Sequence, residues 1–159
     1  GVGDSKKVSP KNREAIFRRA EALKREGVID YQVSLSSARI IDTHGITRAV
    51  SLTMEQSFKK LNLDPLVTDI KLDGLLKAPP VFTSQETIIK GDSKELVIGL
   101  ASILAKVTRD RYMARLGPKY AHYGLEIHKG YGTRMHREAI MMHGLSAIHR
   151  VSFCSRLRK

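Results

Sequence analysis

Two aspartates stand where carboxylates commonly bind a divalent metal. Asp73 directly follows Leu66–Leu72, and Asp92 follows Thr87–Lys90 after one glycine; both segments are predicted strands. Ligands of α/β proteins usually bind where strands end, so both side chains are expected at one edge of a sheet. Mg²⁺ and Mn²⁺ prefer oxygen ligands and can activate water for phosphodiester cleavage. Asp73 and Asp92 are therefore candidate metal ligands and catalytic residues.

The same aspartates also have a purely structural interpretation. Asp73-Gly74 is a common turn pair, and Asp92 could cap the helix that is expected to follow it. Spacing alone favours the turn and the cap over the metal site.

The charge of the chain points to a polyanionic partner. Lys and Arg number 28 against 16 Asp and Glu, which gives a formal net charge of +12. Nucleic acid is the first candidate and an anionic membrane surface the second. No run of about 18 apolar residues predicts a membrane span. Each basic residue taken singly could equally belong to a solvated face.

The elements that must position the aspartates are predicted by hydrophobic periodicity. Helices are expected over about 10–26, 46–61, 94–116 and 134–143, and strands over 28–36, 66–72 and 87–90. This alternation predicts an α/β fold in a single domain, residues 1–159. Residues 120–133 are expected to form a loop, in which Tyr131 stands between two glycines and could stack on a sugar or base. Asp110 could pair with arginines on its own helix, and the histidines are expected to be structural.

Cysteine usage excludes two kinds of stabilisation. Cys154 is the only cysteine, so an internal disulfide and a cysteine-based zinc cluster are both excluded. A reducing, cytoplasmic location is expected. No signal peptide is visible, and the sequence does not begin with Met.

Several stretches, taken in order along the chain, resemble the motifs of ribonuclease HII. They are Asp4-Ser5-Lys6-Lys7 with Ser9-Pro10, Asp73-Gly74, Lys90-Gly91-Asp92, Ala101–Arg111, His128–Thr133, and His149-Arg150 with Ser152-Phe153. The long Ala101–Arg111 stretch together with His-Lys-Gly-Tyr-Gly-Thr is the most specific part. The resemblance extends from Asp4 to Phe153.

The resemblance implies both a fold and an activity. The fold would be a ribonuclease H-like mixed sheet flanked by helices. The activity would be that of an endonuclease that hydrolyses the RNA strand of RNA–DNA hybrids and cuts at ribonucleotides embedded in DNA, by two-metal-ion catalysis with Mg²⁺ or Mn²⁺. The protein would be a monomer acting in DNA replication and repair.

The resemblance also assigns residues to roles. Asp73 and Asp92 would be the third and fourth members of a set of four metal-binding carboxylates. Tyr131 would pack against the deoxyribose at an RNA–DNA junction. The remaining substrate-binding residues would be Lys6 and Lys7 facing phosphate, Ser102 and Lys106 lining the floor beneath the substrate, and Lys129.

The sequence departs from the family in one important respect. The family's Asp-Glu-Ala-Gly-Arg-Gly segment, which holds two metal ligands and the backbone that reads the 2′-OH, does not occur in this sequence, which begins Gly1-Val2-Gly3. We therefore expect a fold without the family's N-terminal strands and impaired activity for this chain alone. Smaller departures are Val8, His44 and Ala121. The alternatives are a non-catalytic basic protein that binds RNA–DNA hybrid or duplex nucleic acid, and a basic structural protein of the ribosomal type.

Overall fold

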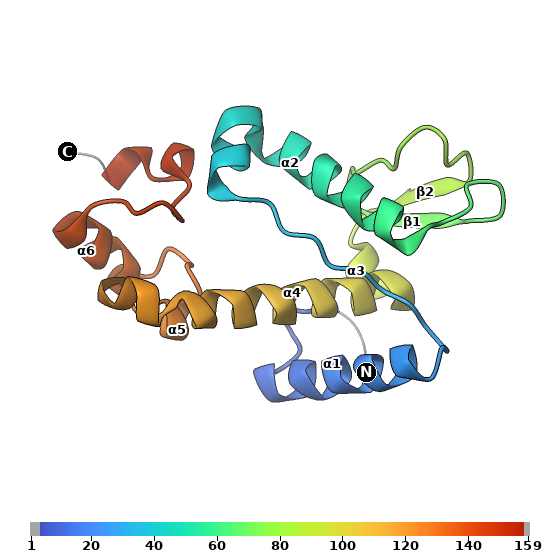
Figure 1. Cartoon of the computed structure of the whole chain (residues 1–159), viewed down its shortest axis with the longest axis horizontal. Helices are drawn as coiled ribbons and strands as arrows, with labels where there is room; N and C mark the ends of the chain where they lie inside the picture. The colour runs from blue at the N-terminus through green and yellow to red at the C-terminus, as the bar shows by residue number, and fades with distance from the viewer. Residues whose placement is uncertain (1–3, 158–159) are drawn as a thin grey trace. The chain divides into compact units, whose positions relative to one another are not determined.

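The computed structural model describes residues 4–157, so Gly1-Val2-Gly3 lie outside the described residues (Figure 1). Its α-helices are α1 Pro10–Arg25, α2 Ala38–Leu61, α3 Gly91–Lys94, α4 Leu96–Leu116, α5 Leu125–His128 and α6 Arg134–His143. Its strands are β1 Ile70–Asp73 and β2 Gln85–Ile88, and its 3₁₀ helices are η1 Pro118–Tyr123, η2 Val151–Phe153 and η3 Ser155–Leu157. The predicted α/β class is confirmed, with a mostly helical chain and a small parallel sheet.

The chain divides into two compact units. The first consists of the residues up to Ser34 together with Val50–Val107, and the second of Leu35–Ala49 together with the residues from Thr108 onward. The single domain predicted from the sequence stays a prediction.

Helix α1 of the first unit forms as its sequence predicts. The Ser9 hydroxyl accepts a hydrogen bond from the Asn12 amide at 3.2 Å, and Pro10 occupies the first helical position. Gly27 follows the helix with a positive φ of 72°, a conformation that glycine adopts without strain. The inner face of α1 then buries its apolar side chains against α4. The buried residues of this core are Phe17, Ala20, Ile103, Leu104 and Val107.

A second core of the same unit lies under the sheet. Strands β1 and β2 are parallel, with Ile70 opposite Gln85 and Asp73 opposite Ile88. Because side chains alternate along a strand, Ile70 and Leu72 point to one face and are buried there. Their apolar neighbours are Ala78, Phe82, Met54, Phe58, Leu63 and Leu76.

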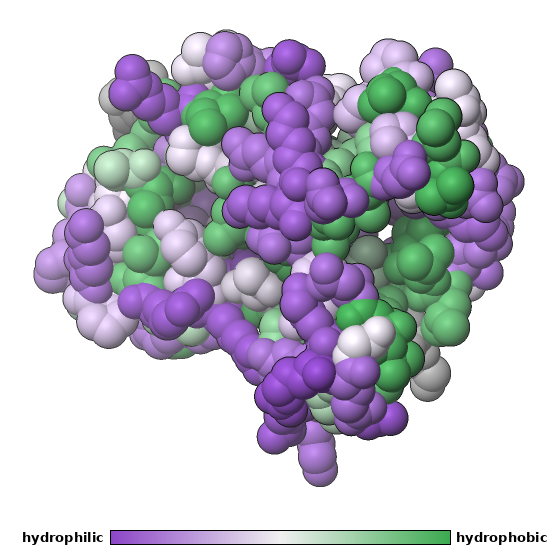
Figure 2. All heavy atoms as spheres, turned by 45° about the vertical axis from the view of Figure 1, so that its right-hand side comes forward, coloured by the Kyte–Doolittle hydropathy of each residue, from purple (hydrophilic) through white to green (hydrophobic). Residues whose placement is uncertain are grey.

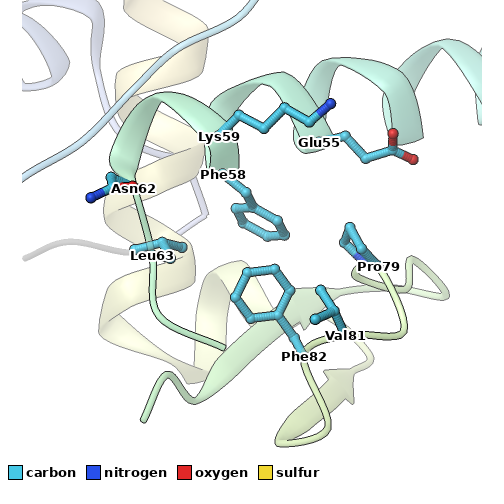
Figure 3. A pocket seen from close by; sticks show the side chains of 8 residues that line it. All are labelled: Glu55, Phe58, Lys59, Asn62, Leu63, Pro79, Val81 and Phe82. Atoms are coloured by element: carbon cyan, nitrogen blue, oxygen red, sulfur yellow. The ribbon is translucent and has the colours of Figure 1, made fainter. Parts of the chain in front are cut away.

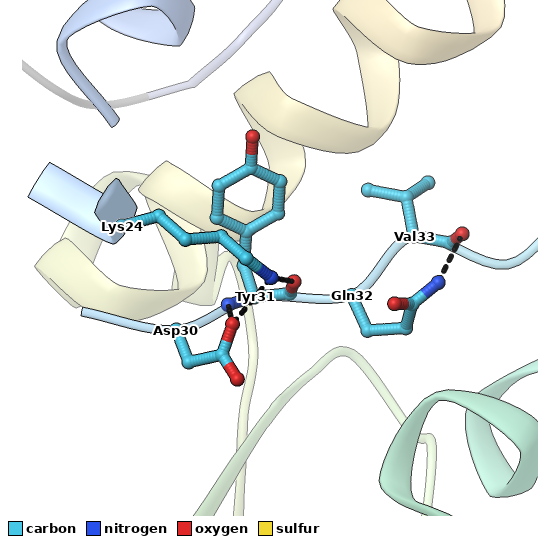
Figure 4. A network of polar contacts seen from close by, with 5 residues as sticks. All are labelled: Lys24, Asp30, Tyr31, Gln32 and Val33. Carbon is cyan, nitrogen blue, oxygen red and sulfur yellow. Dashed lines mark hydrogen bonds and ion pairs between the residues drawn. The ribbon is translucent and has the colours of Figure 1, made fainter. Parts of the chain in front are cut away.

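The predicted strand over residues 28–36 is wrong, because this segment is extended without strand pairing. Its backbone is held by side chains instead: the Lys24 amino group donates to the Tyr31 carbonyl at 2.7 Å and pairs with Asp30 (Figure 4). The Asp30 carboxylate in turn accepts from the Tyr31 amide at 2.7 Å. Tyr31 and Val33 pack on the α1–α4 core. The alternating apolar residues of this segment therefore indicate packing on that core and not pairing with another strand.

Two other elements begin later or earlier than predicted. Helix α2 starts at Ala38 instead of Ile46 and bends at Gly45, whose φ of 77° and ψ of 160° are not helical. Strand β1 starts at Ile70 instead of Leu66, because the Asp64 carboxylate accepts from the Leu66 amide at 2.9 Å and holds a turn there.

The observed bounds of β2, α4 and the segment 120–133 also differ from the predicted ones. Strand β2 spans Gln85–Ile88, because Lys90 is left-handed with φ 57° and cannot extend the strand. Helix α4 begins at Leu96, after the separate short helix α3. The expected loop over 120–133 contains most of η1 and all of α5. Helix α6 has the predicted bounds, with Thr133 as its cap and Gly144 after it.

The second unit has its own core and its own polar anchor. Tyr123, Leu125 and Ile140 are buried together, and the Tyr123 hydroxyl donates to the Gly144 carbonyl at 2.9 Å. The Asp42 carboxylate accepts from the amides of Val151 at 2.7 Å and Ser152 at 3.0 Å, and from the Ser152 hydroxyl. The hydrogen bond from that hydroxyl is the main reason why the pKa of Asp42 lies below its ordinary value.

The surface mixes charged and apolar side chains. Hydrophilic residues cover much of the face in Figure 2, with apolar residues between them. The most exposed large apolar side chains are Leu66, Leu75, Val67 and Met142. No helix within residues 4–157 is long and apolar enough to cross a membrane.

Three histidines are buried in the second unit: His128, His136 and His149. Burial, together with the neighbouring His128, lowers the pKa of His136 below 6.5, although its hydrogen bond with Tyr131 acts in the opposite direction. Burial, together with the neighbouring His136, lowers the pKa of His149, against its hydrogen bond with Ser146. Both rings are therefore favoured in their neutral form when the protein is folded.

We predict that acid destabilises this unit below pH 6.5. The unfolded chain binds protons at these histidines more readily than the folded chain, so their contribution is complete above pH 6.5 and is lost as the pH falls toward the lowered values. Urea unfolding at pH 7.5 and 5.5 would measure the loss. The double variant His136→Asn/His149→Gln should lose less stability over this interval, and an equal loss in both proteins would contradict the assignment. Asp30 and Asp42 titrate below 3.8, outside this interval.

Candidate active site

Asp73 and the segment that carries Asp92 meet at one edge of the sheet. Asp73 is the last residue of β1, and the Gly74 amide donates to the Ile88 carbonyl at 3.1 Å, so the pairing continues to the strand end. Asp73 Oδ1 accepts a hydrogen bond from the Gly91 amide at 2.8 Å. Since Asp92 is the next residue, this bond ties one aspartate to the backbone beside the other.

Gly91 allows this close approach. It is buried, and a Cβ atom at this position would lie 2.6 Å from Ile98 Cδ1 and 3.4 Å from Asp73 Oδ1. A Cβ atom at this position would collide with the Cδ1 methyl of the buried Ile98, while it would only touch the Asp73 carboxylate. The glycine of the Lys-Gly-Asp stretch thus has a steric role beside the carboxylates.

The structural interpretation of the two aspartates is half correct. Gly74 has a φ of 69°, so Asp73-Gly74 does form a turn. Asp92 does not cap α3, because the capping position is taken by Lys90, which makes no side-chain capping bond. Asp92 lies inside the first turn of α3 and is half-buried, while Asp73 is exposed. Asp92 is therefore not a helix cap, whereas Asp73 Oδ1 accepts from the amide of Gly91, the first residue of α3.

The two carboxylates fit part of a magnesium or manganese site. Mg²⁺ is commonly held by one or two carboxylates while waters and substrate phosphates complete its coordination. Oxygen donors also suit Mn²⁺. Within residues 4–157 no group of three or more His, Cys, Asp or Glu side chains could hold a metal. If Asp73 and Asp92 bind a metal, water or phosphate would therefore have to complete its coordination.

The Ser-Lys-Lys loop lies in the same unit and turns its lysines outward. Ser5 is buried and accepts a hydrogen bond from the Ser102 hydroxyl at 2.9 Å. Arg13 donates to the carbonyls of Ser5 at 2.7 Å and Val8 at 2.6 Å. With the loop held from inside, the side chains of Lys6 and Lys7 are exposed.

Ser102 and Lys106 are one helical turn apart on α4. Residues four apart share a helix face, so Lys106 lies beside Ser102 on this face. The structure thus brings Ser102 to the Ser-Lys-Lys loop, where its hydroxyl holds Ser5. A support role for Ser102 is visible, and its predicted place beneath the substrate stays a prediction.

Lys129 and Tyr131 belong to the second unit, on the connection between α5 and α6. Lys129 is left-handed, with φ 52°, and its amino group donates to the Glu126 carbonyl. The Tyr131 amide donates to the His128 carbonyl at 2.9 Å. The Tyr131 side chain remains 48% exposed, which leaves part of its ring accessible to a ligand.

Arg109 supports the Tyr131 ring, a contact that sequence reasoning missed. Its guanidinium carbon lies 4.6 Å from the ring centroid, within the range of a cation–π interaction. Arg109 also lies 3.6 Å from the carboxylate of Asp110, so Asp110 pairs on its own helix, which is one of the alternatives open from the sequence. In the sequence, Arg109 stands out only as part of the Ala101–Arg111 motif.

Further residues that sequence reasoning missed act on backbone groups. Arg13 fixes the Ser-Lys-Lys loop, and Asp42 fixes the segment with Val151 and Ser152. Asp42 is separated from Ser152 by 110 positions. No local spacing indicates such a pair, so no signal in this single sequence could have found it.

A cavity of about 390 Å³ lies elsewhere in the first unit, between α2 and the segment Pro79–Phe82 (Figure 3). The rings of Phe58 and Phe82 meet there edge to face, with centroids 5.2 Å apart. Its lining includes none of the residues predicted to bind metal or substrate. The candidate active site is therefore the sheet edge with its carboxylates, and not this apolar cavity.

Comparison with known proteins identifies the family. The model of the family "Ribonuclease HII" matches residues 1–156. The ribonuclease HII of Caldicellulosiruptor bescii is 43% identical over 153 residues, 96% of this chain and 71% of that protein. The ribonuclease HII of Synechococcus sp. (strain WH7803) is 40% identical over 157 residues, 99% of this chain and 78% of that protein.

A solved structure agrees with these sequence matches. The crystal structure of the ribonuclease H2 from Pyrococcus horikoshii OT3 superimposes with a TM-score of 0.66 at 26% identity, covering 100% of this chain and 82% of that chain. The α/β fold of this chain is thus shared with a known nuclease. The chain belongs to the ribonuclease HII family, the divalent-metal-dependent type 2 ribonuclease H endoribonucleases.

Proposed function

We propose that this chain supplies Asp73 and Asp92 as metal ligands for an endonuclease that hydrolyses the RNA strand of RNA–DNA hybrids and cuts at ribonucleotides embedded in DNA. The chain alone is expected to have impaired activity, because the family's Asp-Glu-Ala-Gly-Arg-Gly segment does not occur in its sequence. The observation that supports the proposal most directly is the hydrogen bond from the Gly91 amide to Asp73 Oδ1 at 2.8 Å. This bond orients one carboxylate oxygen and keeps the Asp92 backbone beside it. With its second oxygen, the Asp73 carboxylate could bind a cation together with Asp92 and a substrate phosphate.

The metal, Mg²⁺ or Mn²⁺, would supply activation of water and stabilisation of the leaving oxygen, with two ions acting together. Asp73 and Asp92 would hold it at the strand edge. Lys6 and Lys7, exposed on a loop held from inside, would bind substrate phosphates. Tyr131 would pack on the deoxyribose of the junction, and Ser102, Lys106 and Lys129 would line the substrate path.

The partner that we propose is RNA–DNA hybrid, or DNA containing ribonucleotides, bound by a monomer. The net charge of +12 supports a polyanion. The second candidate, a protein that binds hybrid without cutting it, is favoured by one observation: within the described residues no three or more His, Cys, Asp or Glu side chains come together to hold a metal. Cleavage and binding therefore need to be measured separately.

The first prediction about the site concerns the carboxylates. In a version extended to include the family's Asp-Glu-Ala-Gly-Arg-Gly segment, Asp73→Asn and Asp92→Asn should each lower the cleavage rate of a duplex with one embedded ribonucleotide by at least about 100-fold, because a metal ligand is removed. Binding of the duplex should change less than about threefold. Glu86→Gln is the matched control, since Glu86 is an exposed carboxylate on β2.

Metal binding gives a readout that does not need turnover. Titration of Mn²⁺ followed by electron paramagnetic resonance should show weaker binding in both aspartate variants and unchanged binding in Glu86→Gln. Unchanged Mn²⁺ binding in the aspartate variants would contradict the metal assignment. Normal binding of hybrid by the wild-type chain without any cleavage would favour the second candidate function.

The second prediction concerns Tyr131. Tyr131→Ala should lower the preference for an RNA–DNA junction over a continuous RNA–DNA hybrid by about tenfold, because a stacking contact contributes roughly 1–3 kcal/mol. Tyr131→Phe keeps the ring and should keep most of the preference. Dissociation constants for the two substrates measure it, and an equal loss on both would argue against contact with the sugar.

The third prediction concerns the lysine loop. Lys6→Ala and Lys7→Ala should weaken hybrid binding and flatten its dependence on salt by about 0.9 in the logarithmic slope for each phosphate that the loop no longer binds. Lys11→Ala, which removes an exposed lysine from α1, is the control. Identical slopes in all four proteins would remove Lys6 and Lys7 from the binding surface.

A further inference from the structure

A chain of hydrogen bonds runs from Ser146 to the backbone of Tyr131. The Ser146 amide lies 3.0 Å from His149 Nδ1, and the Ser146 hydroxyl lies 2.8 Å from the same atom. His149 Nε2 lies 3.0 Å from His136 Nε2. His136 Nδ1 then lies 3.0 Å from the Tyr131 carbonyl oxygen. Both histidines are buried, so these contacts are shielded from water.

The direction of every bond in this chain is fixed by its two ends. The Tyr131 carbonyl can only accept, so His136 Nδ1 must carry the proton. In the neutral His136 ring, Nε2 is then the acceptor, and His149 Nε2 must donate to it. His149 Nδ1 is left as an acceptor, and the Ser146 amide, which can only donate, faces it. The four groups are thus satisfied by one arrangement of protons.

His128 holds the preceding peptide in the same manner. Its Nε2 lies 2.6 Å from the Tyr123 carbonyl and must donate, so its Nδ1 accepts from the Gly130 amide at 3.2 Å. The His128 and His136 rings are stacked with centroids 4.3 Å apart. The two stacked imidazoles therefore bind backbone groups on both sides of the Gly130–Tyr131 peptide: His128 binds the Gly130 amide, and His136 binds the Tyr131 carbonyl.

We propose that His136, oriented by His149 and Ser146, is a positioning residue that sets the plane of the Tyr131 ring for the substrate sugar. The inference rests on the proposed contact between Tyr131 and the sugar. His136 acts on the Tyr131 carbonyl, while the Arg109 guanidinium lies against the ring, 4.6 Å from its centroid. Ring and backbone are thus held by different elements, α4 and α6.

The geometry excludes a role limited to filling space. A packed apolar ring would bury the Tyr131 carbonyl without its second donor, leaving only the Thr133 amide at 2.8 Å. His136 instead supplies a donor whose direction is set by the next residue in the chain of hydrogen bonds. Polarised chains of this kind strengthen each bond and restrict the orientation of the groups at their ends.

The proton arrangement can be measured on the chain without substrate. Long-range proton–nitrogen correlation spectra of ¹⁵N-histidine-labelled protein at pH 7.5 distinguish the two neutral forms of each ring. We expect His136 protonated at Nδ1 and His149 protonated at Nε2. A His136 ring protonated only at Nε2 would overturn the proposal, whatever the substrate assays show.

Two conservative variants test the effect on Tyr131. In His136→Asn the side-chain amide places a donor near the position of Nδ1, whereas in His136→Gln it places one near Nε2. His136→Gln should lower the junction preference about fivefold or more, since a directing hydrogen bond is removed, and His136→Asn should keep most of it. His143→Asn, which changes an exposed histidine of α6, should have no effect.

A double variant separates this inference from the proposed function. If Tyr131→Ala alone leaves the junction preference unchanged, the sugar contact of Tyr131 is wrong. If Tyr131→Ala lowers it and a folded His136→Gln does not, the positioning role is wrong. If both single variants lower the junction preference, His136→Gln should cause no additional loss in the Tyr131→Ala background, because His136 acts only through Tyr131. Additive losses would overturn the proposal. Binding is measured without added Mg²⁺, so that no strand is cut.

Discussion

A hydrogen bond from the Gly91 amide to Asp73 Oδ1 fixes the candidate site of the first unit. Parallel strands end at the same edge, and this bond connects the end of β1 to the first residue of α3. Gly91 can approach so closely because it has no side chain, and Ile98 fills the space beneath it. The parallel strand pairing, the turn at Gly74 and the start of α3 at Gly91 all lie next to this hydrogen bond in the chain.

In the second unit, histidine side chains bind the backbone groups of an irregular segment. Its segment between α5 and α6 has little regular structure, so its amides and carbonyls need side-chain partners. His128 and His136 provide them for Gly130 and Tyr131. Burial lowers the pKa of His136, so the neutral ring that donates to Tyr131 is favoured in the folded protein. In the first unit, Arg13 donates to the carbonyl of Ser5, and the Ser102 hydroxyl donates to the Ser5 hydroxyl.

The sequence predicts features that depend on neighbouring residues better than contacts between residues far apart in the chain. Helices α1 and α6 are marked by their own caps, Ser9 and Thr133, and their positions were predicted closely. The strand predicted over 28–36 was wrong because alternation reports burial, and the partner that would make a strand is not encoded locally. Asp73 and Asp92 were found as residue types at strand ends. The bond between Gly91 and Asp73 was not, because it joins residues 18 positions apart.

Membership in the family assigns motifs to a site, but it does not assign each residue a chemical step. Ser102 belongs to the most specific motif, and its hydroxyl is occupied by Ser5 of another motif. Arg109 belongs to the same motif, and its guanidinium lies against Tyr131. In this chain, residues of these motifs therefore hold one another in place. A substitution at Ser102 or Arg109 would change the geometry of a neighbouring motif, so a loss of activity there cannot by itself identify a residue that touches substrate.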